Sequence, residues 1–158
     1  MARMRADICC FNPTVKLFFL KENLRISVLS AGSMTLNDLT YKIRGSIFSV
    51  HNELGPGLLE SVYEAALFYE LTSLGLCVTS QTGLPVFYKT VTLDLGFRLD
   101  LPVENKIIIE IKSVECLHEI HKKCLLNYLK LADKKLGILV NFNVVKLVDK
   151  ESLIRIIN

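Results

Sequence analysis

The sequence predicts a mixed α/β domain in which helices flank a central mixed β-sheet. Apolar residues recur at helical spacing over residues 36–74, and they alternate with polar residues over 86–112. A further helical pattern over 118–132 precedes a short apolar strand at 137–142. The predicted element order is therefore α-α-β-β-β-α-β. A right-handed crossover through the 118–132 helix would make strands 107–112 and 137–142 parallel.

Length and composition are typical of a single globular domain. The chain has 158 residues, of which 51% are hydrophobic, and this is enough for a substantial core. Residues 1–33 begin with the basic sequence MARMR and show no sustained period, and Asp7 and Pro13 interrupt any signal-peptide core. We therefore expect residues 1–33 to be an upstream extension, poorly ordered or packed opportunistically. The domain itself is expected to span residues 34–158.

Charge and cysteine content limit the classes of partner. A net charge of +3 permits contact with a phosphate backbone but does not by itself predict it. The five cysteines form no C-x-x-C pair and no His/Cys spacing of a zinc site, which favours reduced thiols in a cytoplasmic protein. No apolar run approaches the ~20 residues needed to span a bilayer, so no membrane partner is expected.

The two N-terminal helices are predicted from apolar periodicity and from their stop signals. The first begins at Leu36, with Asn37 or Asp38 as its N-cap, and Gly55-Pro56-Gly57 ends it. The second runs from Leu58 to Leu74. The positions predicted to be buried are Leu39, Ile43, Ile47, Val50 and Leu54 on the first helix, and Leu59, Val62, Ala66 and Tyr69 on the second.

The remaining elements are predicted from alternation, apolar runs and punctuation by Gly and Pro. The expected strands are Val86–Tyr88, Val91–Leu101, Ile107–Lys112, 137–142, 144–148 and 154–157, and the expected helix is 118–132.

A charged hairpin over residues 98–112 is the candidate functional stretch. Because side chains alternate along a strand, Arg98 and Asp100 share one face, and Glu110 and Lys112 share a face of the next strand. Charges in so apolar a hairpin are costly unless something binds them. A hard divalent cation would accept these carboxylate oxygens. The alternative is a solvated face with a cross-strand ion pair.

Two motifs carry a resemblance to a known family. The spacing of Asp100, nine residues, Glu110, one residue and Lys112 resembles that of the PD-(D/E)XK nuclease superfamily. Gly57, Glu60 and Tyr63 match the pattern G-x-x-E-x-x-Y, which is similar to that of the GxxExxY proteins, small bacterial and archaeal members of that group. The resemblance continues through VHNELGPGLLESVYEAAL, GFRLD, IIIEIKSVE, NYLK and GILVNF. It implies a restriction-endonuclease-like PD-(D/E)XK core.

The resemblance also implies roles for individual residues. Asp100 and Glu110 would hold Mg²⁺ (or Mn²⁺), Lys112 would be the catalytic lysine, and Glu60 would assist the metal site. Residues implied to contact substrate or to form the site wall are Tyr63, Arg98, His121, Cys124 and Tyr128. Taken alone, Glu60 would complement a helix N-terminus, Tyr63 would lie in the core, and a helical histidine is more often structural.

The chain departs from the family pattern at two positions. Cys124 stands where the family generally has the Gln of Q-x-x-x-Y, so a polar side chain is missing from the expected site wall. Pro102 follows Asp100-Leu101 where the family has an aliphatic residue, and it predicts a strand end, an edge or a bulge. Neither departure removes an expected metal ligand.

These observations favour a metal-dependent nuclease that hydrolyses phosphodiester bonds of nucleic acid, with DNA as the favoured substrate. The alternative is a catalytically silent domain of the same fold that binds nucleic acid or a protein partner. A structural subunit of a larger complex, and a homodimer, are left open. Five lysines could contact a nucleic-acid backbone or could form a solvated face, namely Lys122, Lys123, Lys130, Lys134 and Lys135.

Overall fold

The computed structural model describes residues 34–93 and 97–158. The expected extension at 1–33 lies outside the described residues. Three helices and eight short strands follow one another within the described part of the chain. They are α1 (Leu36–Leu54), α2 (Glu60–Ser73), β1 (Thr82–Gly83), β2 (Val86–Tyr88), β3 (Val91–Leu93), β4 (Arg98–Leu99), β5 (Leu101–Val103), β6 (Ile107–Lys112), α3 (Glu119–Leu131), β7 (Leu136–Asn141) and β8 (Leu153–Ile157).

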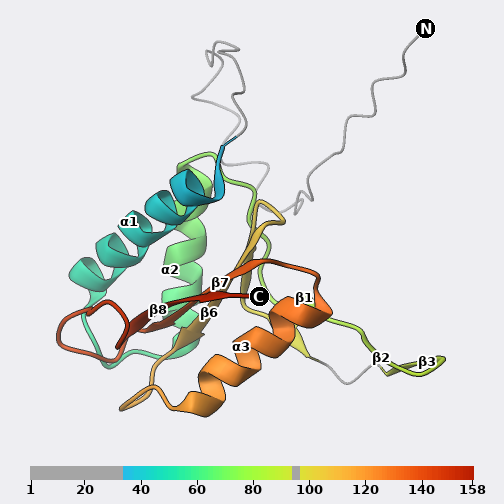
Figure 1. Ribbon diagram of the computed structural model, residues 1–158. Coiled ribbons are helices and arrows are strands. Elements are labelled where there is room, and N and C mark those ends of the chain that lie inside the picture. The colour runs from blue at the N-terminus through green and yellow to red at the C-terminus, as the bar shows by residue number, and fades with distance from the viewer. Residues whose placement is uncertain (1–33, 94–96) are drawn as a thin grey trace, which may run out of the picture. The chain divides into compact units, whose positions relative to one another are not determined.

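The main sheet has four strands in the order β5-β6-β7-β8. Strands β6 and β7 are parallel and are joined through α3, whereas β5 and β8 pair antiparallel at the two edges. Figure 1 shows α3 on one side of this sheet and α1 and α2 on the other. The predicted class, a mixed sheet flanked by helices with a parallel helical crossover, is therefore confirmed.

Helix α1 begins with a reciprocal cap. The Thr35 hydroxyl accepts a hydrogen bond from the Asp38 amide at 3.1 Å, and the Asp38 carboxylate accepts one from the Thr35 amide at 3.2 Å. The N-cap is thus Thr35, and the prediction of Asn37 or Asp38 was wrong by two or three residues. The predicted core positions are buried except for Leu54, which is only partly buried.

Helix α2 buries a different stripe from the predicted one. The structure leaves Leu59 74% and Tyr69 61% exposed, so the predicted stripe was wrong. Because apolar residues occur around most of this helix, periodicity alone does not select the face that meets the sheet. The buried residues are Tyr63, Leu67 and Leu71.

Two of the predicted strands also differ from the structure. The expected strand Val91–Leu101 is interrupted, because β3 pairs with β2 in a separate ribbon while β4 pairs with β1. Residues 143–146 form bends rather than part of a strand, and Val145 is 94% exposed. The chain has to reverse there, because β7 and β8 are antiparallel neighbours. Pro102 lies in the edge strand β5, as its missing amide donor predicted.

Close contact between α3 and β7 depends on Gly137. A Cβ atom at this position would lie 2.9 Å from Leu125 Cδ2, so any larger residue requires the buried Leu125 side chain to shift. Leu125 and Leu129 of α3 are fully buried in a cluster that also contains Ile108 of β6. This packing fixes the height of α3 above the strand that carries Glu110.

The three cysteines that lie in the described part of the chain differ in their redox state. Cys116 and Cys124 are free, whereas Cys77 is disulfide-bonded, so the expectation that every thiol is reduced was wrong at Cys77. Among the residues that the structure describes, no helix is long and apolar enough to cross a membrane.

Candidate active site

The two candidate carboxylates meet where β5 and β6 end their pairing. Leu101 lies opposite Ile109 in this antiparallel pair, so Asp100, one step further, comes opposite Glu110. The Asp100 carboxylate accepts a hydrogen bond from the Ile111 amide at 2.8 Å. The pairing of β5 with β6 ends at Leu101 and Ile109. Beyond it, the Asp100 side chain replaces a backbone carbonyl as the acceptor for the Ile111 amide.

Lys112 binds to the same cluster. Its Nζ donates to Glu110 Oε1 at 2.7 Å and to the Ile111 carbonyl oxygen at 3.1 Å. Glu110 is only 5% exposed, and its second oxygen, Oε2, is buried without a hydrogen-bond partner. An orphaned carboxylate oxygen is costly in so apolar a site, because it has lost its water and gained nothing in return.

Burial and mutual repulsion change the acidity of the cluster. Burial, assisted by the negative charge of Asp100, raises the pKa of Glu110 to about 7. Burial also raises the pKa of Asp100, against the opposing effect of the Ile111 hydrogen bond. Burial alone would lower the pKa of Lys112, but the hydrogen-bonded Glu110 carboxylate, together with the charges of Asp100 and Glu60, outweighs it and the pKa is raised. Ionisation of both Asp100 and Glu110 is therefore unfavourable unless an additional cation binds beside them.

The G-x-x-E-x-x-Y motif positions Glu60, the fourth charged residue of the cluster, beside Asp100, Glu110 and Lys112. The Tyr63 hydroxyl donates to the Gly55 carbonyl at 2.7 Å and accepts from the Leu58 amide at 3.1 Å, while its ring stacks on Phe142. Gly57 has φ of +96°, which favours glycine. The turn before α2 is thus clamped from the core.

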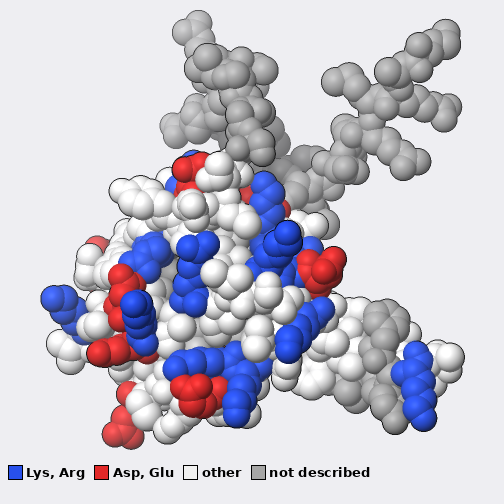
Figure 2. Space-filling model, in the orientation of Figure 1, with Lys and Arg blue, Asp and Glu red and all other residues white. Residues whose placement is uncertain are grey.

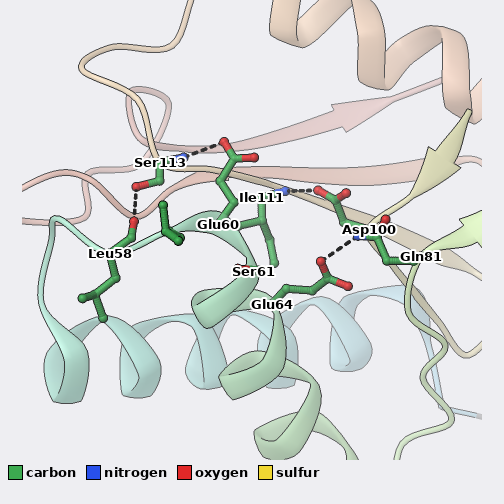
Figure 3. A pocket seen from close by; sticks show the side chains of 9 residues that line it. Leu58, Glu60, Ser61, Glu64, Gln81, Asp100, Ile111 and Ser113 are labelled. Atoms are coloured by element: carbon green, nitrogen blue, oxygen red, sulfur yellow. Dashed lines mark hydrogen bonds between the residues drawn. The ribbon is translucent and has the colours of Figure 1, made fainter.

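Glu60, the first residue of α2, projects from this clamped turn toward the end of β6. Its Oε1 accepts a hydrogen bond from the Ser113 amide at 2.9 Å, and the Ser113 hydroxyl donates to the Leu58 carbonyl at 2.6 Å (Figure 3). Its negative charge raises the pKa of Asp100 and of Glu110 as a minor contribution, which places it within electrostatic range of both. The structure therefore brings Glu60, Asp100, Glu110 and Lys112 together.

An open pocket of about 550 Å³ lies between the start of α2 and this strand end (Figure 3). Sequence reasoning did not select Glu64, one turn after Glu60, although the i, i+4 spacing was a usable signal. The Glu64 carboxylate accepts hydrogen bonds from Ser80 Oγ at 2.9 Å and from Gln81 Nε2 at 2.7 Å. The residues that line the pocket are Leu58, Leu59, Glu60, Ser61, Glu64, Gln81, Asp100, Ile111 and Ser113.

Helix α3 brings Tyr128 to the other side of Glu110. Burial raises the pKa of the Tyr128 hydroxyl, and the charges of Glu110 and Cys124 raise it further, so all three lie within electrostatic range. Cys124 is half-buried one turn before Tyr128. His121 lies in the first turn, where its Nδ1 accepts a hydrogen bond from the His118 amide at 3.0 Å. The described contacts of His121 belong to the start of the helix.

Other residues singled out from the sequence lie elsewhere. Arg98 is exposed on β4 and does not line the pocket. Tyr63 is fully buried and acts on the site through the turn that it clamps. His51, which lies in the segment VHNELGPGLLESVYEAAL of the family resemblance, is also buried, and its Nε2 is hydrogen-bonded to the Val144 carbonyl at 2.7 Å.

The donor set suits a hard cation with few protein ligands. Within residues 34–93 and 97–158, no three His, Cys, Asp or Glu side chains are arranged to hold a metal ion. The available oxygen ligands are the carboxylates of Asp100 and Glu110 and the Ile111 carbonyl. This small set fits magnesium, because the ion keeps several of its waters. The Lys112 ammonium already lies against two such oxygens, Glu110 Oε1 and the Ile111 carbonyl, and Glu110 Oε2 is unsatisfied.

The domain is thus a mixed sheet flanked by helices, with clustered carboxylates and a lysine at one strand end. The sequence model of the PD-(D/E)XK nuclease superfamily matches residues 37–156, and the chain belongs to this superfamily. Membership indicates a nuclease-type function and interaction with nucleic acid, and nucleases of this superfamily typically use divalent metal ions. Comparisons with curated proteins and with solved structures gave no match.

Proposed function

We propose that this protein is a Mg²⁺- or Mn²⁺-dependent nuclease that hydrolyses phosphodiester bonds, with DNA as the favoured substrate. The observation that carries the proposal is the meeting of Asp100 and Glu110 at one strand end, with Lys112 bound to Glu110 and one Glu110 oxygen unsatisfied. In most buried ion pairs that serve only a structural role, both carboxylate oxygens have hydrogen-bond partners.

Asp100 and Glu110, with the Ile111 carbonyl, would hold the cation. When bound, the cation lowers the pKa of a coordinated water and polarises the phosphate. Lys112 then has the reach to orient the attacking water or to offset negative charge that develops on the phosphate. Glu60 adds a negative charge at the rim and fixes the Ser113 amide, so that the strand end keeps its position. Tyr128 closes the site on the α3 side.

We further propose that the chain is one of the GxxExxY proteins. The motif supports this assignment because each of its three residues has a distinct structural use. Gly57 permits the turn, Glu60 reaches the end of β6, and Tyr63 clamps the turn to the core. A cytoplasmic location and a bacterial or archaeal source belong to the same proposal.

The second candidate function is a catalytically silent domain that binds nucleic acid or a protein partner. Cys124 is the observation in its favour, because a thiol is a weak donor and replaces an amide that could bind substrate or a metal-bound water. The retained carboxylates and lysine favour catalysis instead.

The test is cleavage of single-stranded and duplex DNA and of RNA by the purified protein with Mg²⁺, Mn²⁺ or EDTA. We expect metal-dependent cleavage that Glu110→Ala abolishes and that Glu53→Ala, which removes an exposed carboxylate on α1, leaves unchanged. Binding of nucleic acid without cleavage under any of these conditions would favour the silent domain. Equal loss of activity in both variants would refute the assigned site.

A further inference from the structure

We propose that a second, basic pocket holds the phosphate backbone of the nucleic acid on the far side of the segment that follows β6. The pocket has a volume of about 370 Å³ and lies between that segment, the first turn of α3 and the chain that joins β7 to β8. Figure 1 shows these three segments at the same end of the sheet. This inference rests on the proposed nuclease function and specifies how the substrate is held.

Lysines from different segments converge on this pocket. Lys122 comes from α3, and Lys146 and Lys150 come from the connection between β7 and β8. Lys122 is paired with Glu119 at 2.5 Å, whereas neither Lys146 nor Lys150 forms a salt bridge within the described part of the chain. The N-terminus of α3 adds a partial positive charge on the same side. Two carboxylates, Glu115 and Glu151, also line the pocket, so its lining residues carry three positive and two negative charges, and the positive charge left for a phosphate comes chiefly from Lys146 and Lys150.

The two pockets have opposite electrostatic character. The first is lined by the carboxylates of Glu60, Glu64 and Asp100, and none of the described residues that line it is Lys or Arg. An acidic pocket suits a cation, and without that cation it repels phosphate, so the phosphates on either side of the reacting one need positive contacts elsewhere. Figure 2 shows Lys and Arg side chains, with Asp and Glu side chains among them, on the face that carries α3. The basic pocket supplies such contacts where the chain also forms a hollow.

The spacing of the pockets fits one nucleic-acid strand. Ser113 lines the acidic pocket and Glu115 lines the basic one, so at most about 7 Å of chain separates these residues. A strand advances about 3.4 Å per nucleotide in B-form DNA, so a few nucleotides reach from one pocket to the other. Both pockets open at the carboxyl ends of the parallel strands β6 and β7, where ligands of open α/β sheets bind.

The partition between the pockets is rigid. Asn141, the last residue of β7, accepts a hydrogen bond from the Val114 amide at 3.1 Å and donates one to the Val114 carbonyl at 2.8 Å. Asn141 is 1% exposed, so this double contact is protected from water. The segment between the pockets therefore keeps its place, and phosphate bound in the basic pocket would align the strand relative to Asp100.

The test measures binding of a fluorescein-labelled single-stranded oligonucleotide by anisotropy, with EDTA present so that no cleavage competes. The full chain carrying Lys146→Gln and Lys150→Gln is compared with wild type. Loss of two phosphate contacts should raise Kd about tenfold at ~0.15 M salt and should flatten the slope of log K against log salt by about 1.4. The matched control carries Lys42→Gln and Arg155→Gln, which remove two positive charges outside both pockets.

The outcomes separate this inference from the proposed function. A Kd and a salt slope that change equally in the two double variants would overturn the basic pocket, since net charge alone would explain the effect. A wild-type enzyme that cleaves DNA, together with lysine variants that bind like wild type, would overturn only the pocket. A wild-type protein that neither binds nor cleaves nucleic acid would overturn both proposals.

Discussion

Glu110→Gln should stabilise the metal-free protein, and the gain should depend on pH. Burial raises the pKa of Glu110 from its usual 4.5 to about 7. A carboxyl whose folded pKa is raised destabilises the fold when it ionises, so the cost is absent below pH ~4.5 and complete above pH ~7. A difference of about 2.5 pKa units corresponds to about 3 kcal/mol of unfolding free energy, which the neutral amide would restore.

Urea denaturation of wild type and variant in EDTA at about pH 5 and about pH 8 measures this effect. We expect a small gain from the variant at the lower pH and a gain of about 2–4 kcal/mol at the higher pH. Glu53→Gln, at an exposed position on α1, is the matched control and should change stability little at either pH. An equal gain at both pH values, or a loss at the higher pH, would refute the view that a buried, repelled carboxylate destabilises this site. Added Mg²⁺ should stabilise wild type and should have little effect on the variant.

Three further changes test the surroundings of the site. Cys124→Gln should maintain or raise manganese-dependent cleavage without unfolding the protein, and a large fall in activity would give the thiol a role of its own. Tyr63→Phe removes both hydrogen bonds that clamp the turn before Glu60, so it should cost about 1–3 kcal/mol in thermal or urea unfolding and should lower cleavage as well. Unchanged stability would mean that ring stacking alone holds the turn. Gly137→Ala would place Cβ 2.9 Å from Leu125, and a loss of about 1–3 kcal/mol in urea unfolding is expected, whereas a neutral result would show that the leucine moves aside freely.

Much of the fold follows from local pattern. The bounds of β6 were predicted without error, and those of α3 to within one residue, because a short apolar run next to polar turn residues and a long amphipathic stretch are strong local signals. The pairing of Asp100 with Glu110 across an antiparallel hairpin also follows from the alternation of side chains, since residues on neighbouring strands share a face when they are directly opposite. Sequence thus determined which charged groups could meet.

Tertiary contacts decided where those charged groups lie and which hydrogen bonds they make. The predicted stripe on α2 included Leu59 and Tyr69, but Tyr63 packs against Phe142, and the buried stripe lies about one residue further along the helix. The same packing holds the turn from which Glu60 reaches the end of β6. The Asp100 carboxylate bonds to the Ile111 amide because β5 begins only at Leu101, a boundary that the alternating pattern over Val91–Leu101 does not mark. Alternation along a strand is a property of each chain segment by itself. The face that a helix buries and the point where a ladder stops depend on neighbours that are remote in sequence, and these neighbours are defined only after the whole domain has packed.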